Sequence, residues 1–108
     1  MDKKPTRKKC KGMAGLIKEG GDLMKEDADP DVMDAGLISA AQKVEHYEMA
    51  AYGALRTYAQ MMGHDQSARL LQQNLDEEGS ADKKLTAIAE GSINVKAMPD
   101  GAEMPRYR

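Results

Sequence analysis

The sequence predicts an all-α fold built on one long antiparallel pair of helices. The 108-residue chain has no Trp and no Phe, whereas the helix-favouring residues Ala, Leu, Met, Glu, Lys and Gln are abundant. Residues 31–98 contain no proline, and apolar side chains recur there with the spacing of an α-helix. A chain of this length forms one small domain, which excludes two-domain enzymes and most large α/β folds.

Composition and charge limit the class of protein, its partners and its cellular location. Hydrophobic residues make up 41% and charged residues 31% of the chain, which is too apolar for a wholly disordered protein and too charged for a membrane span. The net charge is −2, so we expect neither a nucleic-acid nor a membrane partner. The chain starts without an apolar signal segment, and its single cysteine, Cys10, cannot form an internal disulfide. These features favour a cytoplasmic location.

The two ends of the chain are expected to lack regular structure. Six of the first eleven residues are basic, and we expect residues 1–10 to form a basic flexible arm, with binding to phosphates or anionic surfaces as the alternative. Cys10 lies among these lysines and is either a bystander thiol or one with a lowered pKa. Pro99, Gly101 and Pro105 indicate a flexible C-terminal tail over residues 92–108. The folded part is then residues 11–91.

The first expected helix is short and weak. Residues 11–26 carry apolar side chains at helical spacing, but several glycines lower the helix propensity of this segment. We expect it to stay helical only when it packs on a neighbour. Gly53, which lies off the main apolar stripe of the next helix, is the expected place of that close approach.

The long hairpin has clear start and stop signals. Asp29-Pro30-Asp31 combines an N-cap residue, a proline at the first helical position and an acid at the positive end of the helix dipole. A first long helix is predicted over residues 30–62 and ends at Gly63. A second follows over residues 66–90 and ends at Gly91. Because the loop between them is short, the two helices must be antiparallel.

Four acids occupy positions within the apolar stripes of this hairpin. At about 100° of rotation per residue, Glu48 lies at the centre of the first stripe and Glu45 at its edge, where both carboxylates can converge. Glu78 and Asp82 replace apolar residues in the second stripe in the same way. His46 projects to the opposite side of its helix.

The position of these acids points to a metal site. An ionised carboxylate in a helix bundle is unfavourable unless it is paired or binds a cation. Hard carboxylate oxygens suit iron or manganese, and carboxylate di-metal sites form between the facing helices of four-helix bundles. The candidate metal ligands are Glu45, Glu48, Glu78 and Asp82. Because such sites normally include histidine, three alternatives stay open: one acid is protonated, no metal binds, or the acids pair with Lys43, Arg56, Arg69 or Lys83.

Several segments resemble one known family. The stretch Asp34–Glu48, which contains Val-Glu-His-Tyr-Glu, and the string Leu75-Asp-Glu-Glu78 are similar to the YciE/YciF group of bacterial ferritin-like proteins. The similarity includes the segment Lys8–Ile17 and covers roughly residues 8–97. It implies a four-helix ferritin-like bundle, dimerisation, a link to bacterial stress responses and a di-iron centre. Glu45, Glu48 and Glu78 are the ligands that the resemblance implies, and Asp82 is added by helical projection alone.

The resemblance covers the C-terminal half of the family's pattern, in which another helical pair usually precedes the Lys8-Lys9-Cys10 segment. A two-helix hairpin leaves an apolar stripe exposed, so we expect a ferritin-like half-bundle that forms a homodimer or pairs with a complementary ferritin-like half. The expected function is that of a stress-associated, non-enzymatic helical protein with a working or vestigial carboxylate di-metal site. The alternatives are a metal-free helical interaction or scaffold module, and a di-iron oxidase or peroxide-consuming enzyme.

Overall fold

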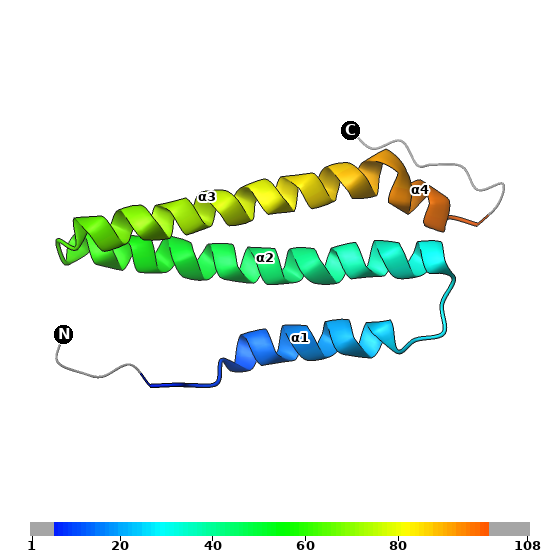
Figure 1. Cartoon of the computed structure of the whole chain (residues 1–108), viewed down its shortest axis with the longest axis horizontal. Helices are drawn as coiled ribbons and strands as arrows, with labels where there is room; N and C mark the ends of the chain where they lie inside the picture. Colours follow the sequence, from blue (N-terminus) through cyan, green and yellow to red (C-terminus); the bar gives the residue numbers. More distant parts are fainter. Residues whose placement is uncertain (1–5, 100–108) are drawn as a thin grey trace.

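Three helices lie side by side in the computed structural model, which describes residues 6–99. Consecutive helices run in opposite directions, and α2 lies between α1 and α3 (Figure 1). The elements are α1 (Lys11–Met24), α2 (Pro30–Met61), α3 (Asp65–Ile88), a π-helical segment η1 (Ala89–Ile93) and α4 (Asn94–Ala97). The all-α class and the long antiparallel hairpin are confirmed. None of the described helices has both the length and the apolar character needed to cross a membrane.

The boundaries of the hairpin follow the local signals of the sequence. The Asp29 side chain accepts a hydrogen bond from the Asp31 backbone N–H at 3.0 Å, and Pro30 is the first residue of α2. Gly63 connects α2 to α3 with a φ of +74°, a conformation that glycine adopts without steric cost. Asp65 begins α3, and the side chain of the preceding His64 makes no cap hydrogen bond.

Two glycines allow α1 to pack closely against α2. A Cβ atom on Gly12 would lie 2.6 Å from the Tyr47 ring, and one on Gly36 would lie 2.9 Å from Leu23 Cδ2. The expectation for Gly53 is wrong, because a Cβ atom there would meet nothing within 4 Å among the described residues. Gly53 lies six residues beyond Tyr47, which is about 120° away around the helix, so it faces away from α1, whose first turn lies beside Tyr47.

The helical part of the chain extends beyond its predicted end. Residues 92–97, expected within the flexible tail, continue the helix through η1 and α4. Gly91 lies inside the π-helical segment, where the chain bends (Figure 1), and α4 then contacts α2. This packing keeps the last turns helical where propensity alone predicts an end. Residues 6–10 have no regular secondary structure, and residues 1–5 and 100–108 of the predicted arm and tail lie outside the described residues.

The helices form one thin layer. It measures 61 × 32 × 16 Å, and its thickness is close to the roughly 10–12 Å diameter of a helix with its side chains. The radius of gyration is 18.1 Å, compared with about 13 Å for a compact domain of this length. Within residues 6–99 the only buried apolar residues are Ala59, Ala68 and Ala89. The apolar stripes of α2 and α3 therefore stay partly open to solvent.

Candidate metal centre

Three of the four predicted ligands meet between α2 and α3. Glu45 and Glu48 come from α2 and Glu78 from α3, and one carboxylate oxygen of each lies within 4.8 Å of the other two. The three-residue spacing places the first two acids on neighbouring positions of one helix face. The antiparallel register then brings Glu78, near the middle of α3, opposite them. All three side chains are half-buried.

Within residues 6–99 this cluster lacks a neutralising partner. The Oε2 atom of Glu45 is buried and has no hydrogen-bond partner among residues 6–99. Lys43 instead forms an ion pair with Glu19 of α1, at 3.5 Å between Nζ and Oε2. Arg56 donates a hydrogen bond to Gln72. None of the ion pairs in the described part of the chain includes the three clustered acids.

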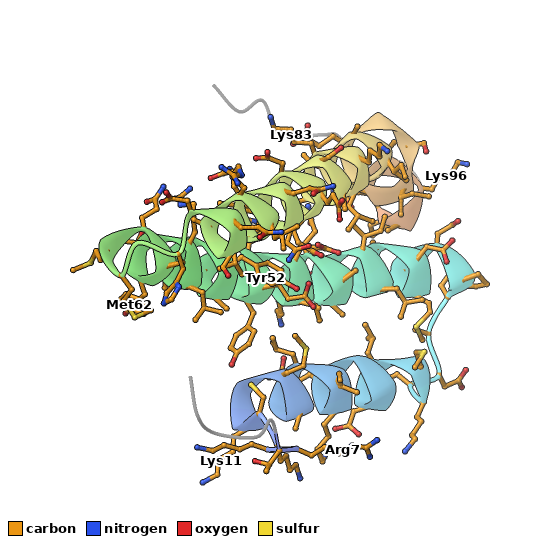
Figure 2. All side chains as sticks on the ribbon, turned by 60° about the vertical axis from the view of Figure 1, so that its left-hand side comes forward. Arg7, Lys11, Tyr52, Met62, Lys83 and Lys96 are labelled. Carbon is orange, nitrogen blue, oxygen red and sulfur yellow. The ribbon has the colours of Figure 1, made fainter. Side chains whose placement is uncertain are left out.

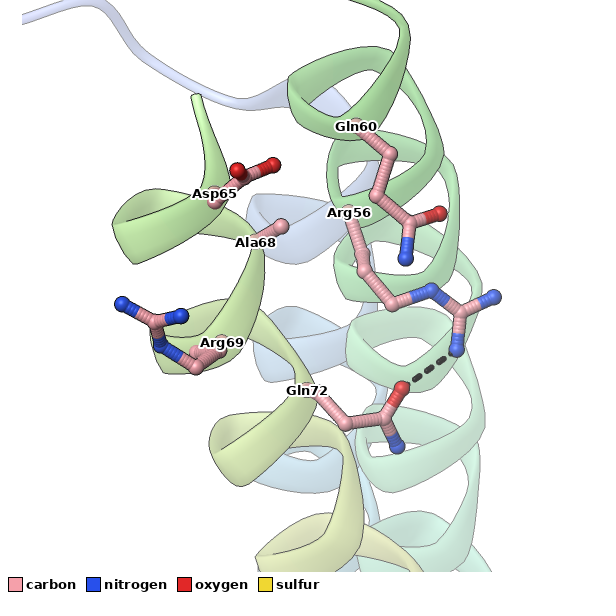
Figure 3. A pocket seen from close by; sticks show the side chains of 6 residues that line it. All are labelled: Arg56, Gln60, Asp65, Ala68, Arg69 and Gln72. Carbon is pink, nitrogen blue, oxygen red and sulfur yellow. Dashed lines mark hydrogen bonds between the residues drawn. The ribbon is translucent and has the colours of Figure 1, made fainter. Parts of the chain in front are cut away.

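The other two cations proposed from the sequence also point elsewhere. Lys83 lies on the outer side of α3, away from α2 (Figure 2). Arg69 is exposed, and its guanidinium group points away from α2 (Figure 3). Pairing with lysine or arginine therefore does not account for the three carboxylates in this structure.

Asp82 is not part of the cluster. Its Oδ1 atom lies 3.1 Å from Nε2 of His46, and its backbone carbonyl accepts a hydrogen bond from Gln42, whose Nε2 also donates to Thr86. The contact with His46 is not an aligned hydrogen bond, since Oδ1 has no hydrogen-bond partner within residues 6–99. Asp82 lies one turn after Glu78, toward the edge of α3 that faces α2, and there it meets His46 instead of the other acids.

Helical projection misplaces Asp82 as a ligand and also misses the contact that His46 makes with it. The His46 side chain is 64% exposed, as expected for the back of the stripe, yet it reaches across to α3. A projection of one helix does not give the register between two helices, which decides this contact. The only signal in the sequence for a role of His46 near the site is that it directly follows the candidate ligand Glu45.

A set of three carboxylates, which offers only oxygen ligands, has a clear preference among cations. Carboxylate oxygens bind hard cations such as Mn²⁺, Mg²⁺ or Ca²⁺, whereas the common non-haem iron sites also use imidazole. The described histidine closest in sequence to the cluster, His46, is placed against Asp82. The residues present fit a hard cation, and the buried oxygen of Glu45 that lacks a partner provides one unused donor atom.

A second hollow, near the turn between α2 and α3, does not form a comparable site. It has a volume of about 330 Å³, and the buried Nε of Arg56 has no hydrogen-bond partner within the described residues. Anion binding there would need converging cations, but Arg56 and Arg69 point in different directions (Figure 3). The lining residues are Arg56, Gln60, Asp65, Ala68, Arg69 and Gln72.

A thiol–phenol contact links the start of α1 to α2. The Sγ atom of Cys10 lies 2.8 Å from the hydroxyl of Tyr47. This hydrogen bond, together with backbone N–H groups of α1, lowers the pKa of the Cys10 thiol. The same contact raises the pKa of Tyr47. Of the two expectations for Cys10, the contact favours a thiol with a lowered pKa.

Comparisons with known proteins agree with this architecture. The family model described as "Domain of unknown function (DUF892)" matches residues 1–98. The chain is 47% identical over 94 residues to the protein YciF of Escherichia coli (strain K12). The matched residues cover 87% of this chain and 57% of YciF.

Solved structures show the same fold. The crystal structure of the E. coli stress protein YciF matches with a TM-score of 0.81 at 45% identity, over 86% of this chain and 58% of that chain. YcfI from Rhodopseudomonas palustris matches with a TM-score of 0.73 at 45% identity, over 79% of this chain and 54% of that chain. The chain thus spans a little more than half the length of these relatives. The resemblance to the YciE/YciF group and the ferritin-like helical fold are confirmed.

Proposed function

Because the chain belongs to the DUF892 family and is closely similar to the stress protein YciF, we propose that it is a stress-associated helical protein. Glu45, Glu48 and Glu78 would bind a hard cation, with manganese favoured over iron because the set contains no histidine. The observation that carries the proposal is the convergence of three carboxylates that form no ion pair with any side chain of residues 6–99. A cation would offset the mutual repulsion of these groups and the unfavourable burial of the Glu45 oxygen.

The protein's own contribution to such a site is position and charge. Glu45 and Glu48 are held one turn apart on α2, and Glu78 faces them from α3, so the donor atoms are already close before a cation binds. Bound iron would supply redox chemistry toward oxygen or peroxide, whereas manganese or magnesium would act as a structural or Lewis-acidic ion. Asp82 and His46 lie beside this set as a separate pair.

The proposal is tested by direct binding of Mn²⁺ to protein freed of metal by chelation. Titration followed by calorimetry and by the EPR signal of free Mn²⁺ should show saturable binding. Glu78→Gln removes one ligand charge with little change in shape and should weaken binding at least tenfold. Glu77→Gln is the matched control, because Glu77 is the adjacent residue but is exposed, and it should bind as the unmodified chain does. Absence of saturable binding, or equal effects of both variants, would contradict the proposal.

A second candidate function is supported by a different observation. Large apolar side chains are exposed along α2 and α3, including Leu55 at 49% and Leu70 at 56%. Exposed apolar side chains serve as an interaction site where they form a contiguous patch. A metal-free helical interaction module would keep its stability and its partner in the presence of chelator, whereas the metal-binding protein would lose stability when the cation is removed.

A further inference from the structure

Four cations lie together at the start of α1. Arg7, Lys8 and Lys9 precede the helix and Lys11 is its first residue, and we call these four residues the basic cluster. All four are exposed. Arg7 and Lys11 lie on the side of α1 that is remote from α2 (Figure 2). The basic cluster is therefore separate from the three acids between α2 and α3.

The charge of the basic cluster is not compensated within the described residues. None of the ion pairs among residues 6–99 includes one of its side chains, and residues 6–18 contain no acid. The first acids that follow are already engaged, since Glu19 pairs with Lys43 at 3.5 Å and Asp22 pairs with Lys18 at 3.0 Å. An external anion therefore meets four positive charges that have no acid partner among residues 6–99.

The backbone that carries the basic cluster is held against the rest of the protein. The Sγ atom of Cys10 lies 2.8 Å from the hydroxyl of Tyr47, and the Cys10 carbonyl accepts a hydrogen bond from the Ala14 N–H at 2.9 Å. Because this segment is anchored on α2, it loses less conformational entropy on binding a ligand than a free arm does. Next to it is a hollow of about 570 Å³. The residues that line this hollow are Lys8, Lys9, Cys10 and Lys11.

The first turn of α1 adds to the positive potential of the hollow. A helix N-terminus presents backbone N–H groups and the positive end of the helix dipole, and both favour anions. The first turn of α1 contains no acid that would cancel this potential. The Tyr47 hydroxyl and the backbone N–H groups of α1 lower the pKa of the Cys10 thiol, so they already favour a negative charge at this place.

The charge of the rest of the chain favours a small anion over a nucleic acid or a membrane. The whole chain carries a net charge of −2, so it carries −6 when the four residues of the basic cluster are left out. This excess repels a long polyanion or an anionic surface. One phosphate group carries about −1.5 to −2 at pH 7, so two of them match four cations. We propose that the basic cluster binds a small anion with two or more phosphate groups, which is a condensed phosphate or a nucleoside di- or triphosphate.

Calorimetric titration of the full chain with tripolyphosphate, in the absence of divalent cations, tests the site. We expect saturable binding to one site per chain that weakens as salt is added, because salt screens exposed charges. Orthophosphate, which has a single phosphate group, should bind about tenfold more weakly. Lys9→Gln and Lys11→Gln should each weaken the binding of tripolyphosphate about fivefold. Lys18→Gln is the matched control, because it removes the same charge from α1 at a residue that Asp22 already neutralises, and it should leave binding unchanged.

A second measurement reports where the anion binds. Cys10 lines the hollow and is the only cysteine of the chain, so bound tripolyphosphate should slow the alkylation of the protein by iodoacetamide. Titration with ATP distinguishes the two sources of phosphate. Tighter binding of ATP than of tripolyphosphate supports the site with a nucleotide as its ligand, and equal binding supports it with the phosphate chain alone as the recognised group.

Three results would overturn the proposal: no saturable binding of tripolyphosphate, an equal loss in Lys9→Gln and Lys18→Gln, or an unchanged alkylation rate of Cys10 at saturation. Tighter binding of a DNA duplex or of anionic lipid vesicles than of tripolyphosphate would overturn the choice of a small anion. The inference is independent of the proposed cation binding, because Glu78→Gln should bind tripolyphosphate as the unmodified chain does.

Discussion

Removal of one charge from the acid cluster should stabilise the metal-free protein. In Glu78→Gln the two repulsive interactions of Glu78 with Glu45 and Glu48 disappear. At the 4.8 Å limit between the donor oxygens, each pair of unit charges repels by about 0.9 kcal/mol in bulk water and about 3.5 kcal/mol at an effective dielectric constant of 20. The half-buried position favours the lower end of this range, so the two pairs together contribute about 2 kcal/mol.

The cation should reduce this advantage. At a Mn²⁺ concentration one hundred times the dissociation constant, the unmodified chain gains about 2.7 kcal/mol. A variant that binds the cation tenfold more weakly gains only about 1.4 kcal/mol at the same concentration. The advantage of Glu78→Gln should therefore shrink from about 2 kcal/mol in chelator to less than about 1 kcal/mol in Mn²⁺.

Denaturant unfolding followed by circular dichroism measures both values, with protein concentration held fixed because association also shifts the transition. Glu77→Gln controls for the loss of any acid from this part of α3 and should change stability little, since its side chain is exposed. Equal stability of Glu78→Gln and the unmodified chain in chelator would refute the argument from repulsion. An equal gain of both proteins in Mn²⁺ would refute the assignment of Glu78 as a ligand.

Three further predictions concern two glycines of α2 and the contact between Cys10 and Tyr47. Gly53→Ala should raise the free energy of unfolding by about 0.5–1 kcal/mol, because alanine favours helix and the added Cβ atom has open space. Gly36→Ala should lose that gain and destabilise by about 1 kcal/mol, since its Cβ atom would lie 2.9 Å from Leu23 Cδ2; equal denaturation midpoints for the two variants would contradict the close packing. Tyr47→Phe removes the hydroxyl that lowers the pKa of Cys10, so this pKa should rise toward its ordinary value of about 8.5. The pH profile of thiol alkylation should therefore shift to higher pH. An unchanged profile would show that the hydroxyl has no such role.

Local features of the chain were sufficient to predict the helices and part of the site. Asp29-Pro30 and Gly63 fix the bounds of α2 through interactions with their own backbone neighbours. Glu45 and Glu48 belong to one helix, so their convergence follows from helical geometry alone. The end of the last helix could not be predicted in this way, because residues 92–97 are kept helical by contact with α2.

The sequence by itself determined the first helix and the two helices of the hairpin, and it showed that acids replace apolar residues in two stripes, because capping, propensity and the helical period act over a few residues. Only the tertiary structure decided which acid of α3 completes the cluster. The register between α2 and α3 places Glu78 beside the acids of α2 and turns Asp82 toward His46. It also decided that Lys43 pairs with Glu19, so that the three carboxylates have no lysine or arginine partner within residues 6–99. These outcomes depend on how helices far apart in sequence align, a quantity set by packing over their whole length.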